Sequence, residues 1–127
     1  MSKTTPLDAE KYVNIETFKK DGNGVKTPIW AAPLDGKIVF FTNVNSFKVK
    51  RLGRNPKLRI AGCDARGKVI HTPWYEATAR QVEGAEADAA DAALGRKYGI
   101  SYKAFRFGAG LIGKKKEQVF FEITLTA

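Results

Sequence analysis

A run of basic side chains is the clearest candidate for chemistry in this sequence. Residues 46–59 contain six Lys or Arg and no Asp or Glu, and they directly follow a hydrophobic, strand-like segment. If Asn45 or Ser46 caps a short helix, the free backbone N–H groups and the positive end of the helix dipole face outward. The Ser46 hydroxyl and the ammonium groups of Lys48 and Lys50 would add further donors. This arrangement predicts a pocket for a phosphate monoester.

The same basic residues have a second interpretation, which the sequence leaves open. A run of charges is often just the solvated face of a helix. Val49 and Leu52 supply the buried side of such a helix under either interpretation.

The elements that must position these residues can be predicted from β-branched and aromatic content, turn residues and helix stop signals. The predicted strands are residues 12–18, 25–32, 37–43, 57–64, 69–82 and 118–126. Asp21-Gly22-Asn23-Gly24 predicts a hairpin turn between the first two strands. A short helix is expected before Asn55-Pro56, and a longer, alanine-rich helix over residues 85–98.

These elements predict a mainly β fold, a closed or nearly closed antiparallel barrel of six strands with one short and one longer helix. The 127 residues are expected to form one domain, preceded by a mobile tail over residues 1–11. The pattern contains neither a dinucleotide-binding glycine fingerprint nor a phosphate loop ending in Gly-Lys-Ser/Thr.

Composition limits the partners. The formal net charge of +9 favours an anionic partner, such as nucleic acid, a membrane surface or a polyanionic cofactor. One Cys and one His exclude an internal disulfide and a zinc site of ordinary spacing, so Cys63 is expected to be a small buried residue. No signal peptide or membrane-spanning run is visible, which favours a soluble cytoplasmic protein.

The order of these segments resembles a known family. The hairpin, the Thr27-Pro28-Ile29-Trp30 strand, Phe41-Thr42-Asn43, residues 46–52 and Asn55-Pro56 are similar to the split-barrel flavin- and deazaflavin-binding family related to pyridoxamine 5'-phosphate oxidase. Within that family the small F420-dependent oxidoreductases are the most similar subgroup. The similarity extends from Tyr12 to the last strand.

The resemblance implies a homodimer of split barrels with two cofactor sites at the subunit interface. It implies a cofactor phosphate near five residues: Thr42, Asn43, Ser46, Lys48 and Lys50. It also implies a tricyclic ring along a second set: Lys26, Thr27, Pro28, Ile29 and Trp30. Trp30 could alternatively be an ordinary core tryptophan.

The resemblance further implies an oxidoreductase in which the cofactor carries the hydride chemistry and an unidentified small organic molecule accepts it. Coenzyme F420, with its phosphodiester and glutamate tail, gains more from a cationic groove than flavin mononucleotide (FMN), which is the alternative. Arg51, Arg54, Arg106 and Lys114–Lys116 could extend that groove. Tyr75, Tyr98 or His71 could deliver a proton, but structural roles explain each of them, so no catalytic residue is assigned.

Two further alternatives remain. Relatives with the same barrel use haem or reduce tetrapyrroles, although His71 alone is weak support for haem ligation. The other alternative is a nucleic-acid-binding barrel that stacks bases on Phe40, Phe41, Trp74 or Tyr75. It is disfavoured because adjacent aromatic residues on a strand point to opposite faces.

Overall fold

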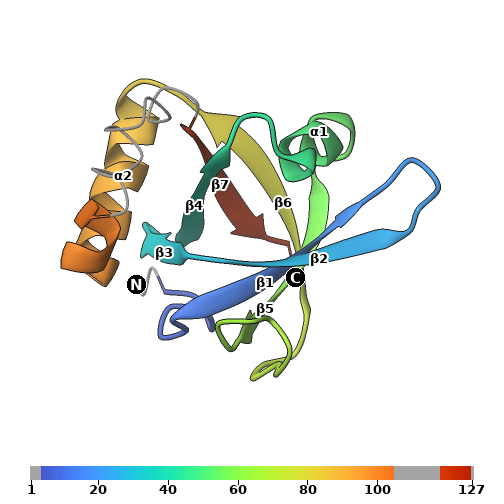
Figure 1. Cartoon of the computed structure of the whole chain (residues 1–127), viewed down its shortest axis with the longest axis horizontal. Coiled ribbons are helices and arrows are strands. Elements are labelled where there is room, and N and C mark those ends of the chain that lie inside the picture. Colours follow the sequence, from blue (N-terminus) through green and yellow to red (C-terminus); the bar gives the residue numbers. More distant parts are fainter. Residues whose placement is uncertain (1–3, 105–117, 127) are drawn as a thin grey trace.

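The structure is a computed structural model that describes residues 4–104 and 118–126 (Figure 1). Its β-strands are β1 (Tyr12–Phe18), β2 (Gly24–Ile29), β3 (Ala31–Leu34), β4 (Lys37–Asn43), β5 (Lys57–Cys63), β6 (Tyr75–Val82) and β7 (Gln118–Leu125). The helices are α1 (Phe47–Arg54) and α2 (Ala85–Tyr98), and residues 100–104 continue helical beyond Gly99. Both predicted helices are therefore confirmed.

The strands form one antiparallel sheet in the order β2-β1-β5-β6-β7-β4-β3. Its two edge strands, β2 and β3, are neighbours in the chain with only Trp30 between them. The sheet must therefore curl until its edges meet at that residue. Figure 1 shows this as one continuous ribbon from β2 into β3, which lies below β4 and β7 in that view.

The predicted number of six strands is wrong, because residues 4–104 and 118–126 alone form seven. The predicted strand over residues 25–32 divides at Trp30, since its first part pairs with β1 and its second part with β4. The predicted strand over residues 69–82 begins only at Tyr75, and residues 64–74 form a loop joined to the sheet by a single bridge between Cys63 and Ile70. Among the described strands no ladder joins β2 to β3, so the barrel is split rather than closed.

The sheet carries a hydrophobic core on each of its faces. On β4, Ile38 and Phe40 point into the first core, while Val39 and Phe41 point into the second, under α2. This alternation follows from the two-residue period of a strand. Phe40 is fully buried and stacks on Phe121 at a ring separation of 5.2 Å. The two aromatic neighbours of β4 therefore lie on opposite faces, as the alternation predicts.

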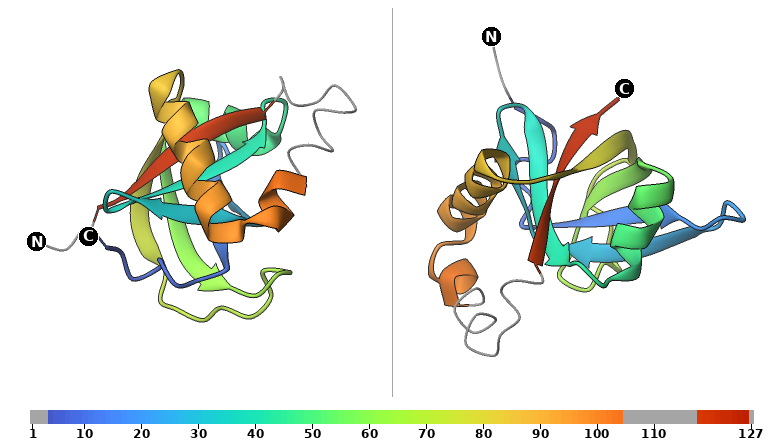
Figure 2. Two further views of the ribbon diagram at one scale, coloured as in Figure 1. Left: turned by 90° about the vertical axis from the view of Figure 1, so that its left-hand side faces the viewer. Right: turned by 90° about the horizontal axis from the view of Figure 1, so that it is seen from above.

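Helix α2 lies across one side of the curled sheet (Figure 2). It buries Ala90, Ala93 and Leu94 against the second core, and the two small alanine side chains allow the helix to approach β3 closely. Its last turn ends at Gly99, whose φ of 59° is the left-handed conformation that favours glycine. The chain turns there into residues 100–104, which bring Tyr102 back under Phe41.

The residues before β1 pack on the fold. Leu7 is only 2% exposed and belongs to the first core. Thr5 and Asp8 form a local turn, in which the Thr5 hydroxyl donates to the Asp8 carboxylate at 2.6 Å. Residues 4–11, within the segment expected to be a tail, therefore contribute to the surface around β1 and α2.

Cys63 is buried and free, as expected, and burial raises the pKa of its thiol. None of the helices in residues 4–104 is long and apolar enough to cross a membrane. Within the described part of the chain, no three His, Cys, Asp or Glu side chains gather in a way that could hold a metal ion.

Candidate functional site

The turn between β4 and α1 brings together four of the residues expected at a phosphate. Asn43 organises this turn, because its carbonyl accepts from the Ser46 N–H at 3.0 Å and its Oδ1 accepts from the Asn45 N–H at 2.8 Å. The Thr42 hydroxyl donates to the Ser46 hydroxyl at 3.4 Å. Lys48 follows in the first turn of α1, so the four side chains share one end of the molecule.

The N-terminus of α1 is not satisfied by its own cap. Ser46 occupies the N-cap position with extended backbone angles, but its side chain makes no capping hydrogen bond, and the first turn contains no acidic residue. The first backbone N–H groups of a helix have no partner within the helix. The Ser46 hydroxyl is directed to Thr42 instead, which leaves these donors available to an external anion.

The charge at this end is positive. Lys48 is half-buried, and burial, followed by the nearby Arg51, lowers the pKa of its ammonium group. In the described residues Lys48 has no carboxylate partner. Arg51 donates from Nε to the Thr17 hydroxyl at 2.6 Å and so ties α1 to β1. An oxyanion fits this group of side chains better than any cation does.

Lys50 lies on another side of α1 from Lys48. Residues two apart on a helix are separated by about 200° around its axis. Lys50 is exposed and places its ammonium group 5.5 Å from the centre of the Phe47 ring. Lys48 and Lys50, which were both expected near the phosphate, therefore project from different sides of α1.

The five residues expected to line a ring do not form one wall. Thr27 and Ile29 pair with Ile15 and Val13, so they face the first core, where Ile29 is 9% exposed. Lys26 and Pro28 pair with Glu16 and Asn14 on the opposite face. Trp30 lies beyond the end of β2, against α2.

The outer face of β1, β2 and β5 is covered by the loop of residues 64–74. Trp74 of this loop lies between two cations, with Lys26 Nζ 5.2 Å and Arg59 Cζ 5.3 Å from its ring centre. Arg59 also pairs with Glu16 at 2.5 Å. Lys26 therefore has a packing role on this outer face.

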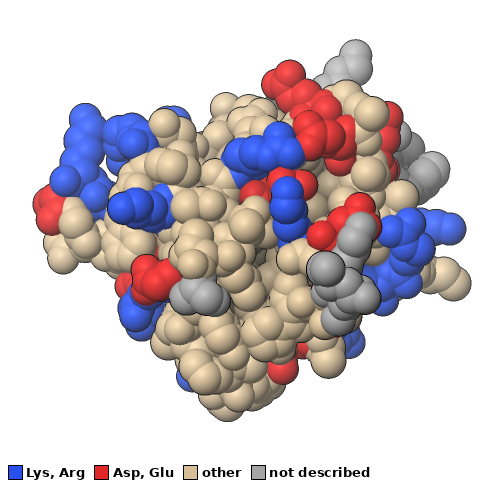
Figure 3. All heavy atoms as spheres, turned by 180° about the vertical axis from the view of Figure 1, so that it is seen from behind, with Lys and Arg blue, Asp and Glu red and all other residues tan. Residues whose placement is uncertain are grey.

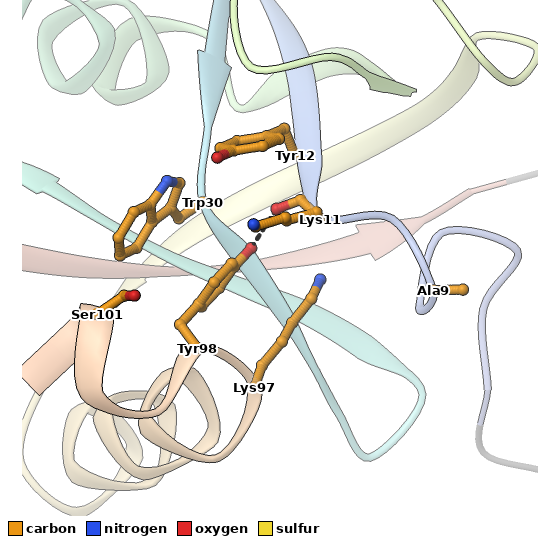
Figure 4. Close-up of a pocket in the computed structure, with 7 residues that line it drawn as sticks. All are labelled: Ala9, Lys11, Tyr12, Trp30, Lys97, Tyr98 and Ser101. Atoms are coloured by element: carbon orange, nitrogen blue, oxygen red, sulfur yellow. Dashed lines mark hydrogen bonds between the residues drawn. The ribbon is translucent and has the colours of Figure 1, made fainter.

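A concave region surrounds Trp30 (Figure 4). Its volume is about 410 Å³, and its lining residues are Ala9, Lys11, Tyr12, Trp30, Lys97, Tyr98 and Ser101. Trp30 stacks on Tyr98 with the ring centres 4.7 Å apart and an angle of 18° between the planes. We call this region the Trp30 pocket.

Sequence reasoning missed most of the Trp30 pocket. Lys11 was placed in a mobile tail, and Lys97 was assigned only to the predicted helix over residues 85–98, where it lies in the last turn. Their proximity depends on packing between segments that are far apart in the chain, which no local pattern reports. Of the lining residues, only Trp30 was expected to contact a cofactor, and Tyr98 was considered only as a proton donor.

Charge is distributed unevenly over the surface. In Figure 3 acidic side chains gather at the upper right, whereas basic ones lie at the left, where the β1–β2 hairpin is, and also in the centre and at the right. Arg51 and Arg54 in the last turn of α1 add to the basic end. Arg106 and Lys114–Lys116, also expected to extend the cationic groove, lie outside the described residues, as does the glycine-containing loop expected over residues 105–113.

Comparisons with known proteins identify the fold. No family model matches the chain, and no curated protein matches it. Solved structures do match. HutZ, the heme storage protein from Vibrio cholerae, superposes with a TM-score of 0.73 at 13% identity, over 94% of this chain and 84% of that one. An FAD-binding protein from Mesorhizobium loti gives 0.61 at 16% identity, over 95% and 85%.

A candidate pyridoxamine 5'-phosphate oxidase from Listeria innocua also matches, with a TM-score of 0.62 at 11% identity over 95% of this chain and 88% of that one. At these identities the likeness establishes the fold. The chain therefore shares the fold of these three proteins, and its own antiparallel sheet curls into a split barrel. The coarse fold class expected from the sequence is confirmed.

Proposed function

We propose that this protein is an oxidoreductase that binds coenzyme F420, with FMN as the alternative, and passes a hydride to a small organic acceptor. The cofactor phosphate would bind at the N-terminus of α1, beside Thr42, Asn43, Ser46 and Lys48. The observation that carries the proposal is the uncapped, acid-free start of this helix on a fold shared with an FAD-binding protein.

The donor set supports a phosphate. Backbone N–H groups at the helix start provide directional donors, and a charge-assisted hydrogen bond from Lys48 would add a stronger one. The hydroxyls of Thr42 and Ser46 can turn toward an oxygen without breaking secondary structure, because they bond only to each other in the described contacts. Ordering them against an anion therefore disrupts nothing else.

Exposed apolar side chains next to the proposed site support a second subunit. Phe47 is 70% exposed and Val44 38% exposed, on either side of the Ser46 cap. Exposed large apolar groups beside a polar site often mark a ligand or an interface. We propose a homodimer in which the partner covers this end and completes the ring site, since residues 26–30 of one chain do not form a continuous wall.

The basic end of the molecule supports F420 over FMN. Arg51 and Arg54 continue the positive charge along α1 beyond Lys48. A cofactor with a chain of glutamates gains from each additional cation it passes, whereas a single terminal phosphate does not.

The bound deazaflavin would supply the hydride, and the protein would supply binding, orientation and exclusion of water. No described side chain is assigned as a proton donor. The Tyr98 hydroxyl accepts from the Ala31 N–H at 2.9 Å and donates to the Lys11 carbonyl, which lies at 2.6 Å. The hydroxyl therefore has a structural role.

Parallel equilibrium titrations with F420 and FMN at near-physiological salt test the proposal. We expect F420 to bind more tightly, with a change in ring fluorescence, and a sedimentation measurement to show a dimer. If FMN binds more tightly, the proposed phosphate site stands, but the cofactor of the proposed oxidoreductase is a flavin. If neither cofactor binds, the proposal of a cofactor-phosphate site at the N-terminus of α1 is wrong.

A haem protein is the second candidate, because HutZ and Campylobacter jejuni ChuZ share the fold and HutZ is a heme storage protein. His71, the one histidine of the chain, has its Nδ1 3.0 Å from the Glu10 carboxylate. A carboxylate bonded to one ring nitrogen orients the other toward a metal. Haem titration of the protein and of His71→Ala distinguishes the candidates: a haem protein would show a Soret shift that the substitution removes.

A further inference from the structure

The Trp30 pocket has the dimensions and the walls of a site for a small planar molecule. Its volume of about 410 Å³ lies in the range of small-ligand sites. Three of its lining residues, Tyr12, Trp30 and Tyr98, are aromatic (Figure 4). Residues of the N-terminal segment, the β2–β3 corner and the C-terminal end of α2 all contribute, so the fold itself builds the pocket.

The aromatic wall is held in place by the backbone around it. The Tyr98 hydroxyl lies 2.9 Å from both the N–H and the carbonyl of Ala31, and 2.6 Å from the Lys11 carbonyl. The Trp30 ring is stacked against Tyr98. Because these rings are already ordered, binding of a planar ligand would not carry the entropy cost of fixing them.

Lys97 places a positive charge at the pocket in a fixed position. Its Nζ donates to the Glu10 carbonyl at 2.5 Å and to the Ala31 carbonyl at 2.6 Å. An ammonium group has three N–H donors. Two are used on these carbonyls, and the third has no hydrogen-bond acceptor among the described contacts, in which Nζ also lies 5.3 Å from the centre of the Tyr98 ring. Burial lowers the pKa of this ammonium group, which reflects how much of its hydration it has lost.

The acidic residues nearest to Lys97 are bonded elsewhere. Asp8 and Glu10 lie close enough to raise the pKa of Lys97 against the effect of burial, but neither lines the pocket. The Asp8 carboxylate accepts from the Thr5 hydroxyl and N–H, and the Glu10 carboxylate pairs with His71. The lining residues therefore include two lysines, Lys11 and Lys97, and no acid.

We propose that the Trp30 pocket binds a planar aromatic carboxylate, with its ring on the Trp30 and Tyr98 side chains and its carboxylate on Lys97 and Lys11. The site is separate from the phosphate site, since α1 and the C-terminal end of α2 lie on opposite sides of the molecule in Figure 1. The inference goes beyond the proposed function and does not depend on which cofactor, if any, binds at α1.

Calorimetry with 2-naphthoate as the probe tests this site directly, with 2-naphthamide as a neutral compound of the same shape. We expect naphthoate to bind and the amide to bind at least tenfold more weakly, because a charge-assisted hydrogen bond is lost. Fluorescence of Trp74→Phe locates the probe, since Trp30 is then the only tryptophan. Its emission should change on addition of naphthoate.

Three lysine variants complete the test. Lys97→Met should weaken naphthoate binding about tenfold or more, and Lys11→Met about threefold, because Lys11 is exposed and partly screened. Lys20→Met, on the distant hairpin, is the matched control and should change nothing. If Lys97→Met does not fold, Lys11→Met and the amide decide.

Equal binding of naphthoate and naphthamide would overturn the proposal. So would affinity unchanged by both Lys11→Met and Lys97→Met, or unaltered Trp30 emission at saturating probe.

Discussion

The two ends of the molecule hold their cations in different ways. At the start of α1, Lys48 is half-buried, has no carboxylate partner among the described residues, and lies next to backbone donors without a cap. At the end of α2, Lys97 is bonded to two backbone carbonyls from separate segments. The first ammonium group is available for binding, whereas the second also holds the fold together. Two half-buried lysines of one chain can therefore have different roles, one in binding and one in stability.

The largest expected difference between Lys48 and Lys97 is the effect of a methionine substitution on the free energy of unfolding. Lys97→Met removes two charge-assisted hydrogen bonds, to the carbonyls of Glu10 and Ala31, so we expect the free energy of unfolding to fall by about 3 kcal/mol. Lys48→Met should change it by less than about 0.5 kcal/mol. Chemical denaturation of both variants measures this, and equal losses would contradict the comparison.

For cofactor binding, unlike for stability, the substitution of Lys48 should have the larger effect. Lys48→Ala is expected to weaken binding of F420 or FMN by about 1.5–3 kcal/mol, the range for a lost charge-assisted hydrogen bond, with the fold intact. Lys68→Ala, in the exposed part of the loop of residues 64–74, is the control and should leave affinity unchanged. If Lys48→Ala binds as the unsubstituted protein does, Lys48 is not at the phosphate.

The strands and helices that carry these residues could be predicted from the sequence. Their pairing and packing in the fold could not. Residues 37–43 and 85–98 were predicted with the bounds that the structure shows, because strand composition, acidic first turns and a terminal glycine are local signals. The division at Trp30 has no local signal, since residues 25–32 read as one strand. It arises because the two halves must pair with β1 and β4 at opposite edges.

The two candidate sites differ in the same respect. Thr42, Asn43, Ser46 and Lys48 lie within seven consecutive residues, so a strand followed by a helix is enough to bring them together. Lys97 instead bonds to carbonyls 87 and 66 positions away along the chain. Contacts of that kind depend on the complete fold, which explains why the pocket at Trp30 was missed.

Alkaline pH should affect the α2 end in particular. Burial raises the pKa of Tyr98 to about 12, above its ordinary value of 10.0. Because the folded pKa is the higher one, its contribution to stability is complete below pH 10.0 and is lost as pH rises through about 12. Tyr98→Phe should cost about 1–2 kcal/mol at neutral pH and should flatten this pH dependence.

Tyrosinate absorbance and denaturation across this pH range provide the measurement. Tyr102→Phe is the comparison variant, since its hydroxyl bonds to Asp91 instead of the backbone of the pocket. A Tyr98 that ionises together with exposed tyrosines would contradict the expected burial.

The smallest expected difference between the two ends is the dependence of ligand affinity on salt concentration. Raising the ionic strength from about 0.15 M to 1 M shortens the screening length from roughly 8 Å to 3 Å. F420 affinity at the exposed basic end should therefore fall several-fold, and naphthoate affinity at the half-buried Lys97 should fall less. Parallel titrations at the two salt concentrations measure both, and a steeper loss for naphthoate would reverse the comparison.

The single residue between β2 and β3 also limits how this chain can change in length. Because Trp30 alone joins the two edges of the sheet, one inserted or deleted residue there would shift one strand by one position and turn its inward side chains outward. The exposed Asp21–Gly24 turn has no such restriction. Loop grafts, tags and natural insertions should therefore be tolerated at the hairpin tip and rejected at the corner, although the two positions are only a few residues apart.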